Sequence, residues 1–70
     1  MPIIHITLVE GRDEKVVSEC VREVARTVSR TLDAPLNSVR VFVTPIQPQF
    51  FSVGDVTKAD SSAQKKLSTP

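Results

Sequence analysis

The sequence lacks tryptophan and tyrosine, and its 70 residues include only one cysteine, one histidine and two glycines. Because Cys20 is alone, no disulfide can staple the chain. Because His5 is the only histidine, the sequence offers neither a Cys/His cluster for a metal nor a Ser-His-Asp arrangement. There is also no glycine-rich phosphate loop. We therefore expect no metal and no cofactor, and any nucleophile or base must be of an unusual kind.

The sequence also lacks a large excess of positive or negative charge: it has nine Lys and Arg residues and eight Asp and Glu residues, for a net charge of +1. Such a balance gives no electrostatic footprint for a nucleic acid or an anionic membrane. No apolar run approaches the roughly 20 residues that span a bilayer, and the N-terminus lacks the layout of a secretory signal. We expect no nucleic-acid partner, no membrane partner and a cytoplasmic location, with which a single unpaired cysteine agrees.

The short length makes the stability of an isolated chain doubtful on energetic grounds. Ordering the chain costs on the order of 100 kcal/mol at roughly 1.5 kcal/mol per residue, which a core this small barely offsets. Hydrophobic residues make up 40% of the sequence, and most of them are Val, Ile, Leu and Ala. Without a disulfide or a metal, self-association is the remaining source of stability, so we expect a homo-oligomer.

Hydrophobic periodicity predicts a strand followed by a helix. The run from Ile3 to Val9 is rich in β-branched residues and ends at a Glu-Gly pair, which is typical of a strand closed by a turn. From Asp13 onward apolar residues recur every three or four positions, which indicates one amphipathic helix capped by Asp13 and stopped before Pro35. The apolar stripe of this helix consists of Val17, Cys20, Val21, Val24, Ala25, Val28 and Leu32.

A second strand is predicted at residues 39–44. Its connection to the first strand contains a helix, so the two strands should be parallel and the crossover right-handed. The fold class is therefore α/β (α+β), with a single β-α-β unit. One helix covers only one face of a two-stranded sheet, and we expect the other face to be buried by dimerisation.

The C-terminal part of the sequence is less regular. A small apolar group at residues 50–55 predicts a short C-terminal hairpin or an edge strand. From Thr57 onward the sequence is polar, and Lys58 is interpreted as part of a solvated tail that would be ordered only by another subunit. We predict a domain of residues 1–56 and a tail of residues 57–70.

Pro2 is the candidate for chemistry. A small second residue commonly permits removal of Met1, which would leave Pro2 as an N-terminal secondary amine. At the start of a buried strand this amine would be partly desolvated, and a nearby guanidinium would further disfavour its charged form; both effects lower its pKa. A neutral amine at pH 7 is suited to general acid-base catalysis.

Several short segments resemble the 4-oxalocrotonate tautomerase family, in order and without gaps. They are residues 2–12, 22–24, 32–36 and 38–41. None is specific alone, but their joint spacing behind a penultimate proline, in a short β-α-β chain, makes the resemblance strong. It covers the sequence well as far as Pro45 and extends more loosely to Phe51 and Gly54.

The resemblance implies an isomerase of aromatic compound degradation that interconverts enol and keto forms of a small unsaturated 2-hydroxy or 2-keto carboxylic acid, such as 2-hydroxymuconate. It implies that Pro2 is the general base, that Arg12 binds a substrate carboxylate, that Arg40 binds and polarises the 2-hydroxy or 2-keto end, and that Phe51 forms an apolar wall. The planar fork of arginine suits such oxygens. It also implies a hexamer, built as a trimer of dimers, in which the arginines reach each Pro2 from neighbouring chains.

Strand geometry independently supports part of this arrangement. Pro2 and Arg12 flank the first strand, and their Cα atoms would lie on the order of 30 Å apart if the segment is extended. If they share a site, that site must lie between subunits. Arg40, at the start of the parallel second strand, can lie near Pro2 of its own chain, and its assignment to a neighbour comes only from the resemblance.

Two other functions fit the same residues. The Pro2 and arginine site could serve hydration or dehalogenation of an unsaturated acid, which would need an acidic residue to activate water; Glu10 and Asp55 are the nearest candidates. Alternatively, the chain could be a non-catalytic oligomeric subunit of the same fold, with Arg12 and Arg40 simply solvated.

Overall fold

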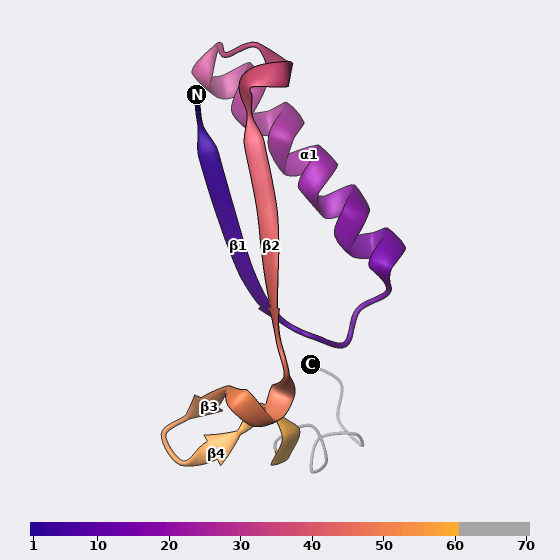
Figure 1. Cartoon of the computed structure of the whole chain (residues 1–70), viewed down its shortest axis with the longest axis vertical. Coiled ribbons are helices and arrows are strands. Elements are labelled where there is room, and N and C mark those ends of the chain that lie inside the picture. Colours follow the sequence, from indigo (N-terminus) through magenta and orange to yellow (C-terminus); the bar gives the residue numbers. More distant parts are fainter. Residues whose placement is uncertain (61–70) are drawn as a thin grey trace.

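A computed structural model of the chain describes residues 1–60 and shows one helix, two long strands and a short hairpin (Figure 1). The elements are β1 (Ile3–Val9), α1 (Glu14–Leu32), η1 (Leu36–Ser38), β2 (Arg40–Ile46), η2 (Pro48–Phe50), β3 (Ser52–Val53) and β4 (Val56–Thr57). Residues 61–70, most of the predicted tail of residues 57–70, lie outside the described residues. Over residues 1–60, no helix has the length and apolar character needed to cross a membrane.

The strands β1 and β2 form a parallel pair whose register runs from Ile3 opposite Arg40 to Val9 opposite Ile46. The helix α1 connects them and lies along one face of the pair (Figure 1). This confirms the predicted β-α-β unit. The strand β2 continues two residues beyond the predicted range, past Pro45, and the Ile46 carbonyl accepts a hydrogen bond from the Glu10 N–H at 2.8 Å. Each strand of a two-stranded sheet has a free edge, where the missing N–H of a proline is tolerated.

Both ends of α1 are closed by aspartates. Asp13 has extended backbone angles, and its side chain accepts a hydrogen bond from the Lys15 N–H at 3.3 Å, which confirms it as the N-cap. At the other end Asp33 adopts the left-handed conformation with φ 55°, and its N–H donates to the Ser29 carbonyl. Asp is one of the few residues that tolerate this conformation. The helix therefore ends at Leu32, three residues before Pro35.

The two faces of the β1–β2 pair differ. Alternate residues on the α1 side are half-buried: Ile4, Ile6, Leu8, Val41 and Val43. On the opposite side, here called the open face, Ile3 remains 65% exposed and Phe42 49% exposed. The His5 ring stacks on Phe42 with centroids 4.5 Å apart, and its Nε2 lies 2.8 Å from the Thr44 hydroxyl oxygen. Even with this stacking, about half of the Phe42 side chain stays exposed in the part of the chain that the structure describes.

A single chain does not enclose a core. None of residues 1–60 is buried, and the radius of gyration is 15.4 Å, whereas a compact chain of this length has roughly 11 Å. Two members of the predicted apolar stripe, Cys20 and Leu32, are exposed, because a two-stranded sheet is too narrow to cover the whole stripe. Further burial of these side chains would therefore require contacts beyond residues 1–60 of one chain.

The predicted C-terminal hairpin is confirmed. Strands β3 and β4 are antiparallel, with Ser52 opposite Thr57 and Val53 opposite Val56. Gly54 occupies the turn with φ 66°, a conformation that glycine adopts without steric cost. The hairpin lies beyond the far end of β2, at the end of the molecule opposite the N-terminus (Figure 1).

Candidate active site

Pro2 and Arg40 lie together at the N-terminal end of the sheet. The Arg40 N–H donates to the Pro2 carbonyl at 2.9 Å, and Arg40 stands opposite Ile3 in the strand register. The Arg40 guanidinium donates to the Asn37 carbonyl at 2.9 Å. Pro2 is half-buried and Arg40 is exposed. The β1–β2 pairing thus brings one predicted cation beside the predicted base within the same chain.

Arg12 and Phe51 lie at the opposite end of the sheet. Both line an open pocket of about 550 Å³, which we call the distal pocket. Its lining consists of Leu8, Val9, Glu10, Gly11, Arg12, Phe51 and Lys58. The Arg12 guanidinium donates to the Val9 carbonyl at 3.4 Å. Of the two adjacent phenylalanines, Phe51 lines this pocket and is 40% exposed, whereas Phe50 is 73% exposed.

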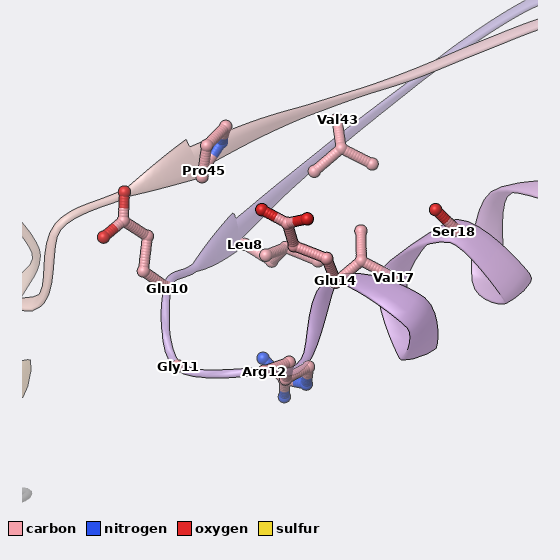
Figure 2. Close-up of a pocket in the computed structure, with 9 residues that line it drawn as sticks. All are labelled: Leu8, Glu10, Gly11, Arg12, Glu14, Val17, Ser18, Val43 and Pro45. Atoms are coloured by element: carbon pink, nitrogen blue, oxygen red, sulfur yellow. The ribbon is translucent and has the colours of Figure 1, made fainter.

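A second open pocket of about 570 Å³ adjoins the distal pocket, between the end of the sheet and the first turns of α1 (Figure 2). Its apolar part is formed by Leu8, Val17, Val43 and Pro45. Its charged part is formed by Glu10, Arg12 and Glu14, and in Figure 2 the Glu14 side chain extends toward Leu8. Glu10 and Arg12 belong to both pockets.

The two pairs of site residues do not meet within one chain. The seven-residue strand β1 separates Pro2 from the loop that carries Arg12, and such a strand spans about 23 Å. This distance exceeds the reach of an arginine side chain. The structure therefore joins Pro2 with Arg40 and Arg12 with Phe51, and leaves the two pairs apart.

Lys58 is the residue that sequence reasoning placed wrongly. It was interpreted as part of a solvated tail, but it is half-buried and lines the distal pocket with Arg12 and Phe51. Its N–H donates to the Phe51 carbonyl at 2.7 Å, because the β3–β4 hairpin brings the residue after β4 back beside the residue before β3. A tight hairpin between Phe51 and Lys58, signalled by Gly54-Asp55, could have indicated this proximity.

Within residues 1–60, the cations at the two ends of the sheet form no ion pairs. Among residues 1–60 the ion pairs join Arg22 and Arg26 to Glu19 and Glu23 along the exposed surface of α1, and none involves Arg12, Arg40 or Lys58. The same residues contain no group of three or more His, Cys, Asp or Glu side chains placed to hold a metal ion. The arrangement offers guanidinium groups for binding an anion.

Comparison with known proteins places this fold and these residues in one family. A model of the tautomerase enzyme family matches residues 2–61. A 2-hydroxymuconate tautomerase from Pseudomonas putida is 44% identical over 54 residues, which are 77% of this chain and 86% of that protein. The chain therefore belongs to the tautomerase family.

Solved structures agree with this assignment. One from a study of the 4-oxalocrotonate tautomerase isozymes of Methylibium petroleiphilum has a TM-score of 0.82 and 33% identity, covering 90% of this chain and 98% of that one. One from a heterohexamer 4-oxalocrotonate tautomerase of Chloroflexus aurantiacus has a TM-score of 0.80 and 28% identity, covering 86% and 97%. The resemblance drawn from the sequence is confirmed.

Proposed function

We propose that the protein is an isomerase that interconverts enol and keto forms of a small unsaturated 2-hydroxy acid such as 2-hydroxymuconate, with Pro2 as its general base. The family and the 2-hydroxymuconate tautomerase relative support this class of reaction. The observation that carries the proposal is the arrangement of the site residues in two pairs at opposite ends of one sheet, Pro2 with Arg40 and Arg12 with Phe51. Each pair is half of a site.

The complete site would form between chains, where the Pro2 end of one copy meets the distal pocket of another. The exposed apolar open face and the absence of buried residues in the described part of the chain support association. A hexamer built as a trimer of dimers is the proposed assembly, and one structural relative is a heterohexamer. The strand register supports a site in which Pro2 and Arg40 come from the same chain, whereas the family resemblance implies that Arg40 comes from a neighbouring chain.

The chemistry would be a proton transfer that needs no cofactor. After removal of Met1, the Pro2 amine takes the 2-hydroxyl proton of the dienol acid and returns it at C3 or C5, which yields the unsaturated ketone. Arg40 would hold the oxygen at C2 as it gains negative charge, and Arg12 would hold the distal carboxylate. Phe51 would shield the reacting carbons from water, which strengthens both electrostatic interactions.

The test is ultraviolet monitoring of 2-hydroxymuconate ketonisation by three forms of the protein. These are the processed chain, Pro2→Ala, and a chain engineered to keep Met1, each checked by intact mass. We expect a loss of about 100-fold or more for the two altered forms, because one lacks the secondary amine and the other holds it as an amide. Equal rates for the processed chain and the Met1-retaining chain would remove Pro2 from the mechanism.

Hydration or dehalogenation of an unsaturated acid is the second candidate. The observation that favours it is that Glu10 lines the same pocket as Arg12 and Phe51, where a carboxylate could activate water. Asp55, the other acidic candidate, lies in the hairpin turn and is exposed. Halide release from a 3-haloacrylate by the processed chain, abolished by Glu10→Gln, would favour this reaction over ketonisation.

A non-catalytic subunit of a mixed oligomer is the third candidate. Loss of Met1 in the native protein is required by both enzyme functions and not by this one. A role in aromatic compound degradation and a cytoplasmic location stay predictions as well.

A further inference from the structure

Lys58 is held beside the proposed substrate-binding residues by its own backbone. Its N–H donates to the Phe51 carbonyl at 2.7 Å, directly after the Ser52–Thr57 pair of the β3–β4 hairpin. The Thr57 hydroxyl oxygen accepts a hydrogen bond from the Asp60 N–H at 3.1 Å and so caps the helical turn that begins at Lys58. The position of Lys58 is therefore set by the hairpin and is not that of a free tail.

The charge of the distal pocket is positive. Its lining contains two cations, Arg12 and Lys58, and one carboxylate, Glu10. Within residues 1–60 neither cation is engaged in an ion pair, and the Arg12 guanidinium donates only a long 3.4 Å hydrogen bond to Val9. An anionic group would therefore be favoured in this pocket.

One carboxylate group can accept hydrogen bonds from both cations of the pocket at the same time. An ionised carboxylate offers about four lone-pair positions, of which a guanidinium fork occupies two. An ammonium group can approach from another direction and donate to a remaining position. Phe51, whose carbonyl accepts from the Lys58 N–H and which lines the same pocket, would contact the hydrocarbon portion of the same ligand.

We infer that Lys58 is a specificity-determining residue that acts with Arg12 on the distal carboxylate, so that the site favours dicarboxylic enol acids over monocarboxylic ones with an apolar distal end. This inference rests on the proposed function. It adds to that function a second residue, Lys58, that discriminates between substrates by the charge of their distal end. The carboxylate next to the reacting carbons would be left to Arg40.

The experiment compares two substrates and four proteins. The substrates are 2-hydroxymuconate, a diacid, and phenylenolpyruvate, whose distal end is an apolar ring. The proteins are the processed wild type, Lys58→Met, Lys58→Arg and the control Lys15→Met, which removes an exposed lysine at the start of α1. We expect Lys58→Met to lower kcat/KM for the diacid about tenfold through KM, because a charge-assisted hydrogen bond is lost. Phenylenolpyruvate turnover should not change, Lys58→Arg should retain diacid turnover, and Lys15→Met should match wild type.

Two results would overturn the role of Lys58. If Lys58→Met lowers turnover of both substrates equally, Lys58 supports the pocket and does not read the distal charge. If it changes neither, Lys58 is solvated in the assembled protein. Calorimetric binding of trans,trans-muconate and of sorbate, the monoacid with the same double-bond geometry, separates this inference from the proposed function. A wild type that ketonises neither substrate contradicts the proposed function. Even then, weaker muconate binding by Lys58→Met, with sorbate binding unaffected, supports the role of Lys58. Unchanged muconate binding by Lys58→Met refutes that role.

Discussion

The open face of the sheet should be a contact between copies of the chain, and Phe42→Ala is the change that tests it. Phe42 lies in the middle of β2, stacks on His5 and remains 49% exposed in the single chain. Shortening it to alanine removes most of the apolar surface at the centre of the open face. The β1–β2 pairing is formed by backbone groups and should survive the substitution.

The size of the effect follows from the area that remains to be covered. A phenylalanine side chain presents roughly 200 Å² of surface, so about half of it, on the order of 100 Å², is available for burial against another copy. At about 25 cal/mol per Å² this amounts to about 2.5 kcal/mol per chain, and to about 5 kcal/mol for a contact between two copies that both carry the substitution, which is a roughly 4,000-fold weaker association constant.

Sedimentation equilibrium over a dilution series measures this constant directly. The matched control is Val16→Ala, because Val16 is 56% exposed but belongs to α1. We expect Phe42→Ala to dissociate at markedly higher protein concentration than wild type, with Val16→Ala close to wild type. Indistinguishable dissociation of the two variants would refute the assignment of the open face as an interface.

Two further predictions concern the base and the helix. The kcat/KM for ketonisation should fall as the pH is lowered, because the protonated Pro2 amine cannot act as a base. Arg40→Gln should move this acid limb of the pH profile to higher pH, since removal of a nearby positive charge stabilises the protonated amine. An unmoved limb would mean that Arg40 does not lie near the amine in the assembled enzyme. Asp13→Ala should lower the free energy of unfolding by about 1 kcal/mol, because the N-cap hydrogen bond to Lys15 is lost. Denaturant titration, with Asp55→Ala in the hairpin turn as the control, should show the loss for Asp13→Ala alone.

The β-α-β unit was predictable because its signals are local. The β-branched run Ile3–Val9, the three- and four-residue spacing from Asp13 and the stop before Pro35 each specify one element, and the helical connection then requires parallel strands. The predicted second strand ended at Thr44, directly before Pro45, two residues earlier than β2 ends. A proline ends a strand only where its missing N–H would break the ladder, and here the register with Leu8 continues past it.

The positions of the candidate site residues were predictable in part, whereas their roles in catalysis and binding stay predictions. The length of β1 was enough to separate Pro2 from Arg12, and the parallel register was enough to place Arg40 at the Pro2 end. Lys58 was not recognised, because its position depends on how a short, weakly apolar hairpin folds back on Phe51. The composition of this segment indicates only that it is polar. It does not predict that the hairpin brings its two flanking residues, Phe51 and Lys58, together.

The central claim, that each site is completed by a second copy, is tested most directly by mixing two inactive chains. One chain carries Pro2→Ala and keeps Arg12, and the other carries Arg12→Ala and keeps Pro2. When the two are unfolded together and reassembled, a site shared between chains should regain about a quarter of wild-type ketonisation, because random mixing can unite an intact Pro2 with an intact Arg12 from a neighbour. Mixed oligomers no more active than the two parents would contradict the shared site.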